Sequence, residues 1–412
     1  RGVRRYGTAV AGRGRAVVFG VVGAVVVLLA MGLAWAVSPA DDGVEVLDAG
    51  PVTPADPDDE PAEAPGPSGS PGSGSGDLET VVAEISAWVE EERGLEFEED
   101  PVVELADEGE FQDRLLADFD EDAEEQAEFQ AELEALGLID EGVDVQEELR
   151  ELLGVGVLGF YDPETKELVV RAGDITPLAR ITIAHELVHA LDDQHFDLDR
   201  PEYDDATDEV GTGFSSITEG NATVIDAAYR DTLSDDEEQA ATDEERELAS
   251  GLDPSIPLVL LQLLSYPYEL GPPLVEAILE DGGQEGLDAA FVDPPTTSEQ
   301  ILDPQRFLDG EEGIDVPAPT ADGEVIYAGA FGALSLAFVL GVDPYDEAVE
   351  GWGGDAYVVW TEGEQTCARA NIVGDTDADT TEIADALNDW AETQPDAEVA
   401  ASADFVTFTA CT

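Results

Sequence analysis

The three histidines of this chain lie within eleven residues, and two of them have the spacing of a metal site. His185 and His189 are four residues apart, which on a helix places them about 40° apart and one turn along. Two imidazoles in this relation can bind one Zn²⁺ and leave positions for a third ligand and a water molecule. Glu186 follows the first imidazole, and its carboxylate can accept the proton of that water during attack on a carbonyl. The pattern predicts a zinc site with a general base.

The residues around this motif predict a buried helix. Thr176 can cap a helix that has Pro177 at its first position and runs to about Gln194. This segment is apolar on most faces, as expected of a helix inside a core. Histidine and glutamate side chains would be costly there without partners. The alternative to a metal site is that both histidines are hydrogen-bonded core residues.

A third ligand is expected on a second helix, predicted near residues 215–230. Glu219 lies 30 residues after His189 in the segment Ile-Thr-Glu-Gly-Asn-Ala-Thr. The small residues Gly220 and Ala222 beside it would let this helix approach the first one closely. Glu219 is therefore our leading candidate for the third ligand.

At this point the sequence resembles the gluzincin type of zinc metallopeptidase, in which HExxH is completed by a glutamate on a following helix. The segments HELVHALDDQHF (185–196) and EGNA (219–222) are similar to an exported bacterial subgroup of that type. The resemblance covers roughly residues 150 to 310. It implies an α+β, zincin-like domain that hydrolyses peptide bonds, with one Zn²⁺ per chain held by His185, His189 and Glu219.

A further stretch, Thr297-Ser-Glu-Gln-Ile-Leu-Asp-Pro, also resembles a motif of the subgroup. The subgroup often has His where this chain has Asp303. This departure leaves the role of that position open.

His195 is the alternative third ligand, because it stands ten residues after His185, the spacing of the third histidine in metzincins. Metzincins need a glycine three residues after the second histidine, and this chain has Asp192 there. On a continued helix His195 would point about 80° away from His185. Its other expected role is a helix-end cap or a bond to a nearby carboxylate.

Two further roles at the site remain open. Asp226 is seven residues after Glu219 on the same helix face, so it can bind an imidazole N–H or form a surface pair with Arg230. Since all three histidines belong to one segment, another group must stabilise the oxyanion beside zinc. The unranked candidates are Tyr203, Tyr229, Arg306 and Tyr327.

The charge balance is extreme, with 97 acidic residues against 16 basic ones. Such a surface repels phosphate, which argues against nucleic acid as a partner. We interpret it as a solvated, screened surface suited to concentrated salt, as in halophilic proteins. The alternative is a surface that attracts cations or basic substrates.

The N-terminal residues predict export. A basic stub (1–15) with five arginines precedes an uncharged run of 22 residues, Ala16 to Val37, which is long enough to span a bilayer. The arginines before it place the remainder of the chain outside the cytoplasmic membrane. We expect a single-pass signal anchor (16–38) followed by a disordered linker (39–76). Ala34-Trp-Ala offers the alternative of signal cleavage and secretion.

The remaining chain divides into a catalytic domain (77–350) and a C-terminal α+β subdomain (351–412). A hairpin is expected at 156–171, just before the motif helix, and a core helix at 326–342. The subdomain is predicted to form a ββαβ unit. Its two cysteines, Cys367 and Cys411, are predicted to form a disulfide because the domain faces an oxidising compartment.

These observations predict an anchored, extracytoplasmic zinc metallopeptidase with Glu186 as general base and a protein or peptide as substrate. One alternative is a zinc-binding pseudo-enzyme or anchored binding module. Another is a zinc amidase acting on cell-wall peptide. The sequence indicates neither the cleavage preference nor the oligomeric state.

Overall fold

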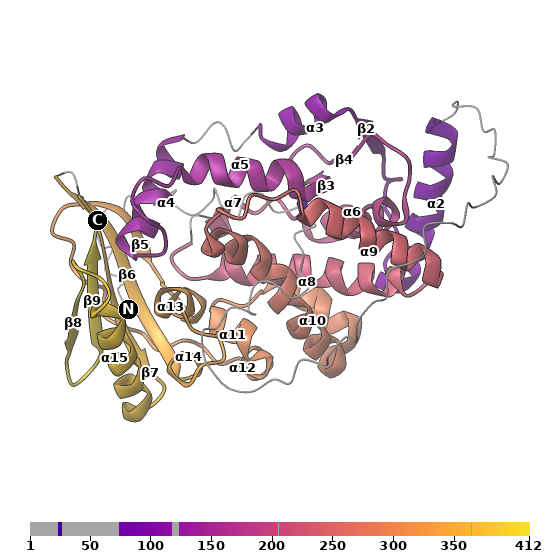
Figure 1. The fold of residues 1–412 in the computed structure, drawn as a ribbon. Helices are drawn as coiled ribbons and strands as arrows, with labels where there is room; N and C mark the ends of the chain where they lie inside the picture. Colours follow the sequence, from indigo (N-terminus) through magenta and orange to yellow (C-terminus); the bar gives the residue numbers. More distant parts are fainter. Residues whose placement is uncertain (1–23, 27–73, 118–122, 205, 364) are drawn as a thin grey trace, which may run out of the picture.

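The computed structural model describes residues 24–26, 74–117, 123–204, 206–363 and 365–412 (Figure 1). The basic stub lies outside these residues. So do the predicted membrane helix and linker, apart from strand β1 (Ala24–Val26) and the start of helix α2 (Gly74–Arg93). Within the described ranges, no helix has the length and apolar character needed to cross a membrane.

The first sheet has four strands in the order β1-β3-β4-β2. Strands β3 (Val157–Asp162) and β4 (Glu167–Arg171) form the antiparallel hairpin that the sequence predicts, and β2 (Val103–Ala106) runs parallel to β4. The hairpin turn closes through Lys166, which has a positive φ of 62° and donates its N–H to the carbonyl of Asp162. Helices α3 (Glu108–Leu115), α4 (Ala123–Ala135) and α5 (Val145–Gly156) connect β2 to β3.

The motif helix α6 (Pro177–Phe196) packs against β3 and β4. The Thr176 hydroxyl accepts the N–H of Ala179 at 3.1 Å, and Pro177 stands at the start of the helix, which confirms the predicted cap. After the short α7 (Pro201–Asp204), helix α8 (Val210–Arg230) packs against both α6 and α10. Helix α9 (Asp235–Ala249) also contacts α6.

Helix α10 (Leu258–Val292) has 35 residues and a kink. Prolines usually break a helix, but α10 continues through Pro267 and Pro272, and its non-helical residue is Gly283, with φ 61°. Leu270 and Leu274 are buried in a cluster with residues of α8, and this burial offsets the hydrogen bonds that the prolines remove. Two short helices follow, α11 (Ser298–Leu302) and α12 (Pro304–Asp309).

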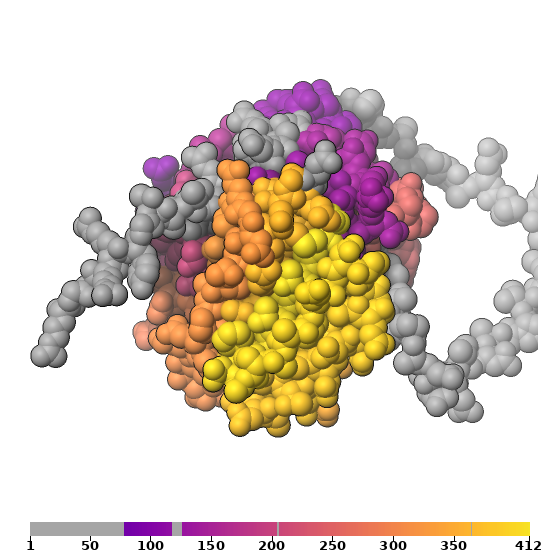
Figure 2. Space-filling model, turned by 90° about the vertical axis from the view of Figure 1, so that its left-hand side faces the viewer, coloured from indigo at the N-terminus to yellow at the C-terminus, as the bar shows by residue number. Residues whose placement is uncertain are grey.

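The second sheet forms one end of the molecule, at the left in Figure 1 and facing the viewer in orange and yellow in Figure 2. Its five antiparallel strands have the order β5-β6-β7-β9-β8. Helix α15 (Asp377–Ala391) packs on it through Ile383, Leu387 and Trp390. The predicted ββαβ unit is confirmed, with β5 and β8 added. The strands are β5 (Glu324–Gly329), β6 (Trp352–Glu362), β7 (Gln365–Gly374), β8 (Glu398–Ala401) and β9 (Val406–Cys411).

The predicted core helix at 326–342 is wrong in its first half. Residues up to Gly329 belong to β5, and the helix there is only α13 (Ala333–Leu340), followed by α14 (Glu347–Glu350). The break lies at Gly332, whose φ of 88° suits glycine, and Asp355 fixes it by accepting the N–H groups of Phe331 and Gly332, each at 2.7 Å. Because β5 and α13 share the core of the second sheet, the predicted boundary at 350/351 cuts through one packed unit.

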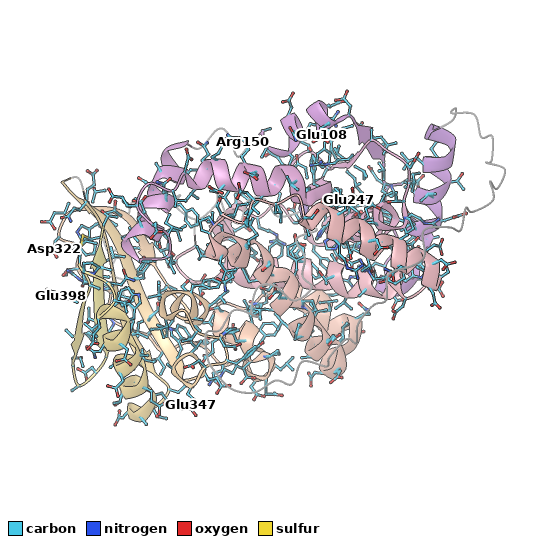
Figure 3. All side chains as sticks on the ribbon, in the orientation of Figure 1. Glu108, Arg150, Glu247, Asp322, Glu347 and Glu398 are labelled. Atoms are coloured by element: carbon cyan, nitrogen blue, oxygen red, sulfur yellow. A yellow bond between two sulfur atoms is a disulfide. The ribbon has the colours of Figure 1, made fainter. Side chains whose placement is uncertain are left out.

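Cys367 and Cys411 are paired across β7 and β9 and form the predicted disulfide. The acidic residues cover the outside of the molecule. Exposed examples on many elements are visible in Figure 3, namely Glu108, Glu247, Asp322, Glu347 and Glu398.

Candidate metal centre

Helices α6 and α8 bring three ligand side chains together. The Nε2 atoms of His185 and His189 lie 3.2 and 3.3 Å from Oε2 of Glu219. One ligand atom from each of the three lies within 4.8 Å of the others, and each residue is at most 2% exposed. The four-residue spacing on α6 places both imidazoles on the same side of the helix, and the carboxylate comes from the facing helix.

The donor set fits a zinc ion. Two imidazole nitrogens and one carboxylate are the three protein ligands of many catalytic zinc sites. His189 Nε2 is buried and makes no hydrogen bond within the described residues, although Glu219 Oε2 is near it. A buried ring nitrogen without a hydrogen bond is costly in a metal-free core, and a metal ion would satisfy it.

Asp226 fixes the orientation of the first imidazole. Its Oδ2 lies 2.7 Å from Nδ1 of His185, so Nε2 of that ring faces Glu219. A carboxylate on the far nitrogen selects the tautomer that can bind a metal through Nε2. The alternative surface pair is not what the structure shows, because Arg230 binds Glu238 and Glu245.

The pKa values of two ligand residues are shifted in opposite directions. Burial alone lowers the pKa of His185, but hydrogen bonds with Asp226 and Glu219 outweigh it and raise that pKa to about 10. Burial likewise raises the pKa of Glu219, but the nearby charge of His189 and the hydrogen bond with His185 lower it to about 2. Glu219 is therefore an anion at neutral pH, and the site carries a proton that a metal ion would displace.

The expected general base, Glu186, is wholly buried on α6 next to His185.

The sequence does not predict an aromatic residue beside His185. The ring of Tyr268, on α10, lies 6.1 Å from the His185 ring at an interplanar angle of 29°. The only sequence signal for it is its place between Pro267 and Pro272, in an apolar stretch of the chain.

Gly220 allows α8 to pack closely against α10, whereas the sequence predicts that it allows close packing against α6. Gly220 faces α10, since a Cβ atom there would lie 2.4 Å from the carbonyl carbon of Gly271. Ala222 instead packs in the core cluster that contains residues of α6, among them Leu187 and Leu191. The small residues near Glu219 thus set the spacing of α8 from both neighbouring helices.

His195 is placed away from the ligand group. Its Nε2 lies 2.9 Å from the carbonyl oxygen of Glu96, on the exposed side of the helix end. The contact is neither of the two roles that the sequence leaves open for His195, because its partner is a backbone carbonyl in the segment after α2. His185, His189 and Glu219 are the group that the described residues assemble.

The contacts found for the four candidates for oxyanion stabilisation are with residues other than the three ligands. The Tyr229 hydroxyl accepts a hydrogen bond from Arg180, and Tyr203 packs edge-on against Phe214. The other two lie toward the second sheet, Tyr327 in its core and Arg306 in ion pairs with Glu299 and Asp375.

The stretch at 297–304 makes hydrogen bonds within its own turn and with the start of α8. Asp303 caps α12 by accepting the N–H of Gln305 at 3.2 Å. Ser298 donates its N–H at 2.8 Å and its hydroxyl at 3.1 Å to Glu209, which precedes α8. The motif therefore ties the start of the helix that carries Glu219 to the C-terminal half.

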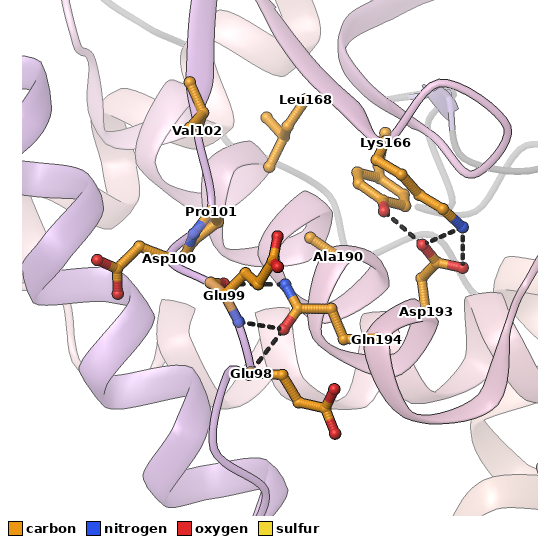
Figure 4. Close-up of a pocket in the computed structure, with 11 residues that line it drawn as sticks. Glu98, Glu99, Asp100, Pro101, Val102, Lys166, Leu168, Ala190, Asp193 and Gln194 are labelled. Atoms are coloured by element: carbon orange, nitrogen blue, oxygen red, sulfur yellow. Dashed lines mark hydrogen bonds and ion pairs between the residues drawn. The ribbon is translucent and has the colours of Figure 1, made fainter.

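A pocket of about 390 Å³ lies on another face of α6, between that helix and the segment 98–102 (Figure 4). Its best-anchored polar group is Asp193, which accepts the Tyr161 hydroxyl at 2.5 Å and pairs with Lys166 at 2.8 Å. Burial, followed by this hydrogen bond, raises the pKa of Tyr161. None of the three ligand residues lines the pocket.

Comparison with known proteins bears on the C-terminal part of the chain. Residues 283–410 match the model of a domain of unknown function, DUF8575. The match begins at the kink in α10 and ends in β9, so it covers the second sheet and none of the three ligand residues. Neither a curated protein nor a solved structure matches the chain.

Proposed function

We propose that this protein is a zinc metallopeptidase of the gluzincin type, with a zincin-like domain that hydrolyses peptide bonds. The observation that carries the proposal is the convergence of His185, His189 and Glu219 from two helices into one buried group. The sequence separates the third residue from the second by 30 positions, so the fold and not local spacing brings them together.

Each residue has a distinct task in this proposal. A zinc ion held by the three ligands would polarise the substrate carbonyl and make a water molecule more acidic. Glu186 takes the proton of that water and passes it to the leaving amine. Asp226 holds the His185 ring so that Nε2 faces the ligand group. Glu219 supplies the negative charge that balances the ion.

The ligand count favours catalysis over a structural zinc site. Structural sites are closed by four protein ligands, whereas catalytic ones keep a fourth position open. The described residues offer three ligands, and a glutamate stands next to one of them on α6. A binding module would need no base at that position.

We further propose that the catalytic part is extracytoplasmic and anchored to the membrane through its N-terminal segment, and that it acts on proteins or peptides. The disulfide between Cys367 and Cys411 supports an oxidising compartment. The acidic surface supports function in concentrated salt.

The test is hydrolysis of casein and of a quenched-fluorescence peptide library by the purified chain at high salt. Activity should disappear on treatment with a zinc chelator and return when one equivalent of zinc is added back. Activity that survives complete removal of zinc would refute the proposal. Hydrolysis of cell-wall peptide alone, with the same zinc dependence, would replace the peptidase assignment with an amidase.

A further inference from the structure

A hydrogen bond between two buried side chains joins α6 and α8, the helices that carry the candidate metal ligands. Asn221 donates its side-chain N–H to Oδ2 of Asp192 at 2.6 Å. Asp192 lies three residues after His189 on α6, and Asn221 lies two residues after Glu219 on α8. Both are 1% exposed, so the bond is made inside the protein close to the ligands.

The other oxygen of Asp192 is bound by a buried arginine. The Nε of Arg93, at the end of α2, lies 2.8 Å from Oδ1 of Asp192, and the arginine side chain is completely buried. Its remaining nitrogens bind Gln284 at 2.7 Å and Asp288 at 2.8 Å, both on α10. Its guanidinium also lies over the rings of Phe196 and Phe291.

The network is sensitive to substitution, because every buried charge in it must stay paired. Both oxygens of Asp192 are used, one by Arg93 and one by Asn221. If either donor is lost, a carboxylate oxygen is left buried without a partner, which costs more than an average hydrogen bond contributes. The network therefore tolerates little variation in the distance between α6 and α8.

We infer that Asn221 and Arg93, acting through Asp192, are positioning residues that fix the separation of α6 and α8 so that the ligand group is assembled before zinc arrives. The inference rests on the proposed zinc site. Zinc binds imidazole and carboxylate ligands at about 2.0–2.2 Å, so a small shift between the helices misplaces Glu219 relative to the two histidines. A bond two to three residues from the ligands on each helix is well placed to prevent that shift.

An exchange of the two side chains tests the inference. Asn221→Asp places two carboxylates together and should weaken zinc binding at least ~10–100-fold, the range seen when groups that orient metal ligands are lost. The double variant Asp192→Asn with Asn221→Asp restores a donor and an acceptor. The amide now on α6 can accept from Arg93 and donate to the carboxylate now on α8. The zinc affinity of the double variant should return to within a few-fold of the wild-type value.

The readouts are zinc competition against a chromophoric chelator and the visible absorption spectrum of the Co²⁺-loaded protein. The spectrum reports ligand geometry, which a purely stabilising contact would not alter. Leu387→Ala is the matched control, because it opens a cavity in the second sheet without touching α6 or α8. It should lower the unfolding temperature and leave zinc affinity and the spectrum unchanged.

If Asn221→Asp does not fold, Asn221→Ala removes only the donor and should weaken zinc binding about 10-fold. Wild-type zinc affinity and spectrum in the folded Asn221 variant would overturn the inference while leaving the zinc site intact. If His189→Ala binds zinc as tightly as the wild type, the proposed site itself fails, which is a separate result.

Discussion

Nδ1 of His185 lies 2.7 Å from Oδ2 of Asp226, seven residues beyond Glu219 on the same helix. Seven residues are close to two helical turns, so α8 presents both carboxylates to the same imidazole. One carboxylate faces Nε2 as a candidate metal ligand, and the other holds the opposite nitrogen. A single helix thus supplies a ligand and the group that orients a second ligand.

Removal of the orienting carboxylate should weaken zinc binding without abolishing it. We expect Asp226→Ala to lower zinc affinity ~10–100-fold, because the His185 ring loses the bond that fixes its tautomer. Competition with a chromophoric chelator measures the change. Asp231→Ala removes the same charge from an exposed position at the end of α8 and is the matched control. Equal affinities for the two variants would contradict the orienting role.

The third ligand is tested by comparing Glu219 with His195. Glu219→Ala removes a carboxylate that lies within 3.3 Å of both imidazoles. We expect this variant to bind zinc ~10²-fold more weakly or worse, by analogy with the loss of groups that orient metal ligands. His195→Ala removes a side chain bound to the Glu96 carbonyl and should leave zinc affinity unchanged. Dialysis of both variants against a chelator series, followed by metal analysis, measures retention. Loss of zinc in His195→Ala, with retention in Glu219→Ala, would favour the metzincin-like arrangement.

Zinc binding should release a proton at neutral pH. Burial lowers the pKa of His185, but Asp226 and Glu219 raise it to about 10, so the metal-free ring is protonated at pH 7. Zinc needs the neutral ring, whereas Glu219, with a pKa of about 2, is already ionised. Affinity should therefore rise about tenfold per pH unit between pH 6 and 9, and level off near the pKa of His185.

Calorimetric titration with zinc in buffers of different ionisation enthalpy counts the released proton. Asp226→Asn is the control for this measurement, because loss of the negative partner lowers the pKa of His185 and reduces proton release. Zinc binding with no proton release, and with an affinity independent of pH, would contradict the charge state described for the metal-free site.

Local signals predict the elements that carry the ligands. Thr176 and Pro177 mark the start of α6, and the hairpin before it follows from strand alternation around a turn. The pairing of His185 with His189 follows from helix geometry alone. Glu219 can be proposed from the resemblance, but its contact with both imidazoles depends on how α8 packs.

Long-range packing decides what local patterns cannot predict. The sequence predicts that Gly220 faces α6, yet it meets Gly271 of α10, because two glycines allow the backbones of α8 and α10 to touch. The apolar run at 326–342 is predicted as one helix although it is rich in glycine, and pairing with β6 draws its first residues into a sheet. Arg93 lies about a hundred residues from Asp192, and no local pattern indicates that they meet.

The substitution Glu186→Gln tests the proposed chemistry most directly. The side chain keeps its size and remains next to His185, but an amide cannot accept the proton of the attacking water. Zinc content and peptide hydrolysis should be measured on the same preparation of wild type and variant. The account predicts one equivalent of bound zinc in both, with hydrolysis by the variant reduced at least ~10²-fold. A zinc-loaded Glu186→Gln variant with near-normal turnover would contradict it.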